Sequence, residues 1–293
     1  MLKKLMLFLL FVFFCGINLS FGLDWKSLHE KADSMNLDDA QKACRDNPDS
    51  IEELYVLALA YLNLHKDKEA EEVFHRILAL DPKISWAKWG LAEALRRKHQ
   101  PQKSEDLINE VFKALPDFPP ACITLAYINY NRLNFNQAVM LANKVLKQGE
   151  KKVDRNNYVR ALLLYAGTKG TIAHYGGALS KLINGTAVLR NLKAADKLQP
   201  ESAAVSFGLG SYYLLAPALA GGNLEKAKAH LKKAVAIDPH FPDAYVRLAQ
   251  LYKIKGDNAA YSRYLNKALE IDPQNELAQD ISSGRCKFIC PYK

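Results

Sequence analysis

The chain has 293 residues, a formal charge of +9 and 49% hydrophobic residues. Its positive charge is scattered, because basic pairs such as Lys151–Lys152 and Lys232–Lys233 alternate with helices rich in Glu and Asp. Without a basic stripe, a nucleic-acid partner is not expected. After residue 22, no stretch is long and apolar enough to predict a transmembrane span.

The segment 1–22 predicts a secretory signal peptide. A short basic start at residues 1–4 precedes an apolar run at 5–14 and a small-x-small site at 20–22, which favours cleavage after Gly22. Two alternatives stay open. The segment is retained as an anchor, or the chain is lipid-modified at Cys15, although Phe14 stands where lipoprotein processing needs a small residue.

Beyond this segment, prolines recur at a fixed step. Pro48, Pro82 and Pro116 are evenly spaced, and Pro239 and Pro273 are separated by the same step. That step is about 34 residues, the length of one helix–turn–helix repeat, so the period predicts a helical solenoid. A solenoid has no single deep active-site cleft, but its long concave face commonly binds a partner. The period therefore favours a binding protein over an enzyme.

The predicted units follow in chain order. Residues 23–50 are expected to form N-terminal capping helices, and residues 51–152 three regular repeats. Residues 153–241 are expected to form two enlarged repeats, and residues 242–275 are expected to form another regular repeat. Residues 276–293 are expected to form a solvent-facing capping helix and a tail. In that tail, Cys286 and Cys290 are predicted to form a disulfide in an oxidising compartment; the alternative is two free thiols.

Small, large and aromatic residues recur at fixed places in each unit. In residues 51–84 these places hold Leu54, Leu57, Ala58, Tyr61, Ala70, Phe74, Ile77 and Pro82. Small residues let two helices approach closely, and the proline ends the second helix because it lacks an amide hydrogen. The pattern resembles that of tetratricopeptide (TPR) repeats. This resemblance implies an all-α, right-handed solenoid of about six helical hairpins.

The two enlarged repeats are expected to carry insertions between their helices. One contains Gly176-Gly177 and runs to Gly185, and the other ends in Gly221-Gly222. Both are apolar, whereas a solvated loop is normally polar. Their leucines and isoleucine either pack on one another or form a pocket wall, a lid or a partner-docking surface. The candidate residues of this insertion edge are Leu179, Leu182, Ile183, Leu215 and Leu219.

The TPR resemblance implies that the first helix of each unit lines the concave face. The register places an unusually aromatic set there, and Trp, Tyr and Arg are common interface anchors. These side chains are expected to bind an apolar ligand, an extended peptide or a helix; alternatively, some brace adjacent repeats. The set is Tyr55, Trp86, Trp89, Arg96, Arg97, Tyr127, Tyr130 and Phe207, with Val159 and Leu163 in a less certain register.

A narrower resemblance comes from the segment that runs from Gly221-Gly222-Asn223 to Ala227. It is similar to a motif of the T component of tripartite ATP-independent periplasmic (TRAP) transporters. That resemblance implies an apolar, ligand-accommodating pore and a periplasmic solute-binding protein as partner. Members of that family are typically lipoproteins, and the residue before Cys15 departs from that pattern.

The sequence thus predicts an exported, non-catalytic bacterial binding protein in the periplasm or envelope, with a protein, peptide or small apolar ligand. The alternatives are an accessory T component of a TRAP-type uptake system and an envelope-assembly scaffold. No cofactor or metal is expected. The seven histidines are dispersed, and no phosphate loop or nucleophile motif is present.

Overall fold

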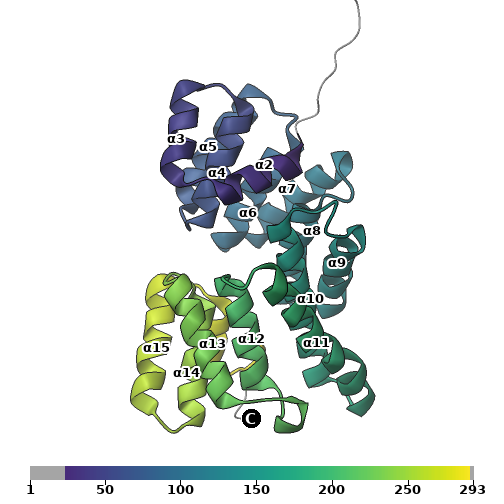
Figure 1. Ribbon diagram of the computed structural model, residues 1–293, viewed down its shortest axis with the longest axis vertical. Helices are drawn as coiled ribbons and strands as arrows, with labels where there is room; N and C mark the ends of the chain where they lie inside the picture. Colours follow the sequence, from purple (N-terminus) through teal and green to yellow (C-terminus); the bar gives the residue numbers. More distant parts are fainter. Residues whose placement is uncertain (1–23, 291–293) are drawn as a thin grey trace, which may run out of the picture.

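The computed structural model describes residues 24–290 (Figure 1). In that range the chain forms fifteen α-helices, one 3-10 turn and no strand. The all-α helical-hairpin fold predicted from the proline period is therefore confirmed. The predicted signal peptide, its cleavage site and Cys15 lie outside the described residues.

Most helices form consecutive hairpins. The regular N-terminal ones are α4 (Ile51–Asn63) with α5 (Asp67–Leu80), α6 (Ser85–Arg97) with α7 (Pro101–Ala114), and α8 (Pro119–Asn131) with α9 (Phe135–Gln148). They are preceded by α2 (Trp25–Ser34) and α3 (Leu37–Asp46). A long hairpin of α10 (Arg155–Tyr175) and α11 (Ala178–Leu198) follows. The last elements are α12 (Ala203–Leu215), α13 (Leu224–Ile237), α14 (Pro242–Ile254), α15 (Asn258–Ile271) and α16 (Glu276–Ser282).

The hairpins are arranged in two groups joined along one side. Figure 1 shows α2–α7 as an upper group and α12–α15 as a lower group, with α8–α11 connecting them. We refer to α2–α7 as the N-terminal half and to α12–α16 as the C-terminal half. This curvature brings helices that are far apart in sequence to face one another.

Small residues allow the helices of neighbouring hairpins to pack closely. A Cβ atom on Gly90 would lie only 2.2 Å from the ring of Phe74, and one on Gly210 would lie 2.7 Å from Leu231. Glycine is therefore required at both crossings unless the facing side chain moves. Polar caps start many helices; the Ser50 hydroxyl, for example, accepts a hydrogen bond from the Glu53 amide.

The turn inside each regular hairpin uses a left-handed backbone residue. The residue two positions after α4, α6, α8 and α14 has a positive φ: His65 at 57°, His99 at 55°, Leu133 at 65° and Gly256 at 77°. Glycine adopts this conformation without steric cost, whereas in other residues the Cβ atom makes the conformation less favourable. Three of the four turns therefore hold a side chain at a position that favours glycine.

The first predicted insertion is not a loop, and this prediction was wrong. Helices α10 and α11 are each 21 residues long, and residues 178–185 form the first turns of α11. The extra residues lengthen both helices and only Gly176-Gly177 forms the turn. Ala187, Val188 and Leu192 of α11 are buried in the core, and their packing offsets the cost of about 1 kcal/mol for Gly185 inside a helix.

The second insertion is a compact turn that includes a 3-10 segment, Ala218–Ala220. Gly221 has a φ of 93°, and a Cβ on Gly222 would lie 1.9 Å from the Ala216 carbonyl oxygen. Asn223 then caps α13 by accepting a hydrogen bond from the Lys226 amide at 2.9 Å. The Gly-Gly-Asn motif thus has a structural role in starting α13.

The C-terminal segment is not solvent-facing, which corrects a second prediction. In α16, Leu277, Ala278 and Ile281 are buried against α14. The chain then folds back as a loop of residues 284–290, which we call the C-terminal loop. Its Phe288 and Cys290 side chains are also buried. The apolar face of α16 and this loop together close the end of the solenoid.

Candidate functional site

A cavity of about 170 Å³ lies where the N-terminal half faces α10 and the start of α12. We call this cavity the central cavity. Its wall is partly apolar and partly polar. The apolar lining comes from Leu59, Leu62, Trp89, Val159, Leu163 and Ala204. The polar lining comes from His29, Asp33, Asn63, Glu93, Arg97, Asn156, Asn157, Arg160, Gln199 and Ser202.

The polar side of the cavity is built around the buried carboxylate of Glu93. Arg96 donates to it from Nε and Nη2 at 3.0 and 2.9 Å, and Arg160 donates from Nη2 at 2.9 Å. Arg97 donates at 3.3 Å, and the Thr124 hydroxyl donates at 2.8 Å. Burial raises the pKa of Glu93, but the arginines outweigh this and hold it well below its usual range. One carboxylate thus links α6, α8 and α10.

Positive charge exceeds the negative charge in this group. Arg97 also contacts Asp67 at 3.3 Å, so three guanidinium groups share the carboxylates of Glu93 and Asp67. The side chains of Arg97 and Arg160 both line the central cavity. Guanidinium groups at a cavity wall offer several N–H donors to a polar or anionic ligand group.

A second polar network joins α2 to α10. His29 Nε2 lies 2.9 Å from the Tyr55 hydroxyl, and the Asn157 amide donates to His29 Nδ1 at 3.1 Å. Asn157 also donates to the Asp154 carboxylate at 2.8 Å. Burial lowers the pKa of His29 to about 4, which outweighs the opposing effect of Asp154. The imidazole is therefore neutral at pH 7 and serves as a bridge between the two helices.

Asp33 stands at the exposed edge of the cavity. Its carboxylate accepts a hydrogen bond from Asn156, which in turn accepts one from Gln199. Desolvation and the nearby Asp154 raise the pKa of Asp33 to about 6. The cavity thus has an acidic edge on α2 and a guanidinium wall on α6 and α10.

The aromatic residues predicted to line an open groove in the first repeats are buried. Tyr55 is fully buried, Trp89 is 2% exposed and Trp86 is 7% exposed. The Trp89 indole N–H donates to the Thr124 hydroxyl at 3.0 Å, and Trp86 packs against Tyr55. Their predicted exposure was wrong, because α2 and the polar bridge to α10 cover this face. Trp89 still contributes part of its surface to the cavity.

The other predicted groove aromatics also have partners within the chain. The Tyr127 ring lies under the guanidinium groups of Arg96 and Arg160, at 5.0 and 5.7 Å. Tyr130 stacks on Phe288 of the C-terminal loop, with ring centroids 5.6 Å apart. Phe207 of α12 packs against Phe241, at 5.0 Å between ring centroids. These rings therefore brace the solenoid rather than line an empty groove.

Part of the predicted insertion edge is exposed. Leu179, Leu182 and Ile183 of α11 are 70%, 66% and 60% exposed, and Leu219 beside α12 is fully exposed. Leu215, in contrast, packs against the core between α12 and α14. The expected apolar edge thus exists at the tip of the α10–α11 hairpin.

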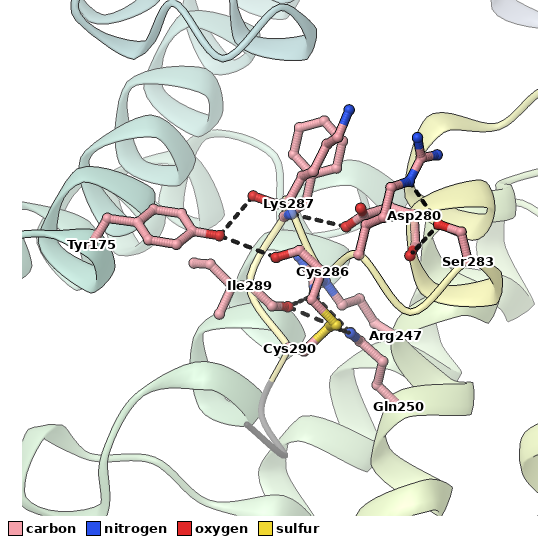
Figure 2. Close-up of a disulfide and its surroundings, with 11 residues drawn as sticks. Tyr175, Arg247, Gln250, Asp280, Ser283, Cys286, Lys287, Ile289 and Cys290 are labelled. Atoms are coloured by element: carbon pink, nitrogen blue, oxygen red, sulfur yellow. Dashed lines mark hydrogen bonds between the residues drawn. A yellow bond between two sulfur atoms is a disulfide. The ribbon is translucent and has the colours of Figure 1, made fainter.

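The C-terminal loop lies against the middle repeats, and its Cys286 and Cys290 form a disulfide (Figure 2). The Tyr175 hydroxyl contacts the Cys286 and Lys287 carbonyl oxygens at 3.2 and 2.7 Å. Arg247 donates to the Ile289 carbonyl oxygen at 3.1 Å. The loop therefore connects α10 to α14 through backbone carbonyl groups.

Several cavity residues were absent from the sequence prediction. Asn157 and Arg160 were not proposed because the register of the fourth repeat was uncertain. His29 was not proposed because it lies on α2, which was expected only to cap the solenoid. Val159 and Leu163 were placed on the inner face and do line the cavity, so their neighbour Arg160 could have been considered. Across residues 24–290, no group of His, Cys, Asp or Glu side chains is suited to hold a metal ion. Over the same residues, every helix is too short or too polar to cross a membrane.

Comparison with protein families gives one match. The family model described as TRAP transporter T-component matches residues 177–288. This range includes α11 to α16 and the Gly221-Gly222-Asn223 turn. A search of curated proteins gave no match.

Solved structures similar to this chain include TPR proteins. A thermophilic TPR protein of Thermus thermophilus aligns with a TM-score of 0.55 and 21% identity, over 68% of this chain and 97% of that one. A tetratricopeptide repeat protein from Parabacteroides merdae aligns with a TM-score of 0.52 and 17% identity, over 89% of this chain and 98% of that one. IFIT1, solved as a monomeric mutant with Gppp-AAAA, aligns with a TM-score of 0.59 and 15% identity. This alignment covers 88% of this chain and 58% of IFIT1. The fold is thus that of the TPR proteins.

Proposed function

We propose that the protein is an exported, non-catalytic binding component of a TRAP-type solute-uptake system in the bacterial periplasm. The match of residues 177–288 to the T-component family carries this proposal. A TPR fold is compatible with it, because helical solenoids bind partners through extended surfaces rather than perform chemistry in a deep cleft.

The central cavity is the proposed ligand site. Its volume of about 170 Å³ is close to that of a cavity that holds one benzene-sized molecule, so it suits a small ligand rather than a helix or an extended peptide. Leu59, Leu62 and Leu163 offer an apolar surface, while Arg97 and Arg160 offer donors beside it. A small amphipathic solute with one anionic group matches both walls. The aromatic residues first expected to bind directly then act by bracing this cavity.

The exposed tip of α11 is the proposed docking edge for a solute-binding protein. Leu179, Leu182 and Ile183 form an apolar surface on consecutive turns, within the range that matches the T-component family. Exposed apolar patches of this kind commonly mark protein interaction sites. Arg190 and Lys193 follow on the same helix and are exposed, which favours a partner surface with acidic residues at its rim.

Cross-linking and affinity capture from the periplasm of the native host test this assignment. The wild type should capture a periplasmic solute-binding protein, and the double variant Leu182→Ser/Ile183→Ser should lose most of it. Met140→Ser is the matched control, because Met140 is 61% exposed on α9, outside the T-component match. Equal capture by both variants would contradict the docking edge, and no capture of a solute-binding protein would contradict the proposed role.

A further inference from the structure

Two histidines connect the N-terminal half to the C-terminal half. His65, in the α4–α5 turn, lies with Nε2 2.9 Å from the Asp238 carboxylate at the end of α13. His99, in the α6–α7 turn, lies with Nε2 3.0 Å from Asp272 and with Nδ1 3.3 Å from Glu276. We call these contacts the polar clasp.

The two contacts follow the repeat. His65 and His99 are separated by one repeat length, and Asp238 and Asp272 by the same step. Each histidine is 173 residues from its aspartate. The same turn position in two successive hairpins therefore meets the same helix end in two others. A chance surface contact would not be expected to repeat with this register.

Both clasp histidines occupy a backbone position that favours glycine. Both histidines occupy the left-handed turn position, with φ of 57° and 55°, that Gly256 holds in the α14–α15 hairpin. A side chain there carries a conformational cost that glycine avoids. At His65 and His99, the cost is accompanied by a contact across the solenoid, which Gly256 could not make.

The geometry of His99 fits a charged imidazole. A neutral imidazole has one N–H donor, whereas an imidazolium has two. Both ring nitrogens of His99 lie within hydrogen-bond range of a carboxylate oxygen, on Asp272 and Glu276. An imidazolium can donate to both carboxylates at once, whereas a neutral imidazole can donate to only one.

The charged groups around the clasp are mostly complementary. The C-terminal half presents Asp238, Asp272 and Glu276, with the partly buried Asp243 behind them. In the N-terminal half, Arg96 adds a positive charge that acts on Glu276.

Two further groups on the C-terminal side modify this balance. His240 has its ring centroid 6.3 Å from that of His65, so a second imidazole stands beside this contact. Arg247 attracts Asp243. His99 contacts two carboxylates, on Asp272 and Glu276, whereas His65 contacts one, on Asp238.

We propose that the polar clasp holds the solenoid closed beside the central cavity at mildly acidic pH and loosens as the pH rises. Imidazole groups as a class titrate between pH 5 and 8. An imidazolium attracts a carboxylate more strongly than a neutral imidazole does, so by linkage protonation favours the closed form. Partly exposed pairs each change such an equilibrium by roughly 1.5- to 5-fold, so two pairs change it by roughly 2- to 25-fold.

The clasp is connected to the cavity through two short segments. Leu62 and Asn63 line the cavity immediately before His65, and Arg97 lines it two residues before His99. The opposite wall includes Ala204, in the first turn of α12 at the start of the C-terminal half. Separation of the halves would move these walls apart. The functional consequence, control of ligand retention, rests on the proposed ligand site; the conformational change does not.

Small-angle X-ray scattering of the full chain at pH 5.5 and pH 8.0 tests the clasp. The wild type should have a larger radius of gyration at pH 8.0. The variant His65→Gln/His99→Gln should show the larger value at both pH values. His75→Gln is the matched control, because His75 is exposed on α5, and it should behave as the wild type. Asp33→Asn is measured in parallel to separate the effect of the clasp from that of Asp33, because the raised pKa of Asp33, about 6, lies between the two pH values compared.

A second variant protects the test against a folding defect. Asp238→Asn/Asp272→Asn keeps the amide oxygens that can accept the backbone hydrogen bonds from His240 and Gln274. It should also remain expanded at pH 5.5. A wild-type radius that does not change with pH, or clasp variants as compact as the wild type at pH 5.5, would overturn the proposal.

Ligand binding is measured separately with hexanoate as the probe, by titration calorimetry. The wild type should bind hexanoate a few-fold more tightly at pH 5.5 than at pH 8.0. The clasp variants should show a smaller difference, which comes from the titration of Asp33 at the cavity edge. An equal pH dependence in the clasp variants would refute control of the cavity by the clasp. If no protein binds hexanoate, the proposed ligand site is contradicted, and the scattering experiment alone decides the clasp.

Discussion

Replacement of Glu93 by Gln should destabilise the protein strongly. The carboxylate is 1% exposed and contacts the guanidinium groups of Arg96, Arg97 and Arg160. Glu93→Gln removes the negative charge that these three cations share. Breaking a buried ion pair by removal of one partner typically costs about 3–5 kcal/mol. Urea unfolding at pH 7 should show a loss of this size in the free energy of unfolding.

The matched control is Glu110→Gln. Glu110 pairs with Lys88 at 2.7 Å on the surface, where such pairs contribute about 0–1 kcal/mol. The arginines hold the pKa of Glu93 well below its usual range, despite the opposing effect of burial. Its stabilising contribution should therefore be complete at neutral pH and be lost only as the pH falls through that depressed pKa. Equal losses for the two variants would refute the role of Glu93 as the centre of the network.

Three further substitutions test the packing. Trp89→Ala should cost about 3–5 kcal/mol of stability, at least as much as Leu91→Ala, because Trp89 is 2% exposed; a loss below about 1 kcal/mol in urea unfolding would contradict its buried position. Gly90→Ala should cost about 1–3 kcal/mol by the same assay, because its Cβ would meet the Phe74 ring, and a neutral result would show that the ring moves freely. Cys286→Ser should accelerate amide hydrogen exchange in the C-terminal loop. The melting temperature should change little, because the disulfide closes only a short segment of chain. An unchanged exchange rate would show that packing alone holds the loop.

The repeat period was sufficient to predict the fold. Prolines and small residues at fixed spacing specify helical hairpins, because each hairpin depends mainly on contacts within itself and with its immediate neighbours. The enlarged repeat was harder to predict. A glycine pair followed by an apolar run is compatible with either a loop or a longer helical hairpin, and only the packing of α10 against α11 decides between them.

The candidate site could be predicted in part. The register placed Trp89, Arg97, Val159 and Leu163 on the inner side, and all four side chains line the central cavity. It could not predict how far that side is covered, because the curvature of a solenoid accumulates over many small rotations between hairpins. The bridge from His29 of α2 to α10 and the polar clasp both join residues that are far apart in the sequence. Neither has a local pattern in the sequence.

The central claim is that the cavity beside Arg97 and Arg160 holds a small ligand. Native mass spectrometry of the exported wild-type protein tests it directly, with Ala204→Phe as the comparison, because Ala204 lines the cavity and a phenyl ring would fill part of it. We predict a bound small molecule on the wild type that is absent from a folded Ala204→Phe variant. No bound species on the wild type, or the same species on both proteins, would contradict the claim.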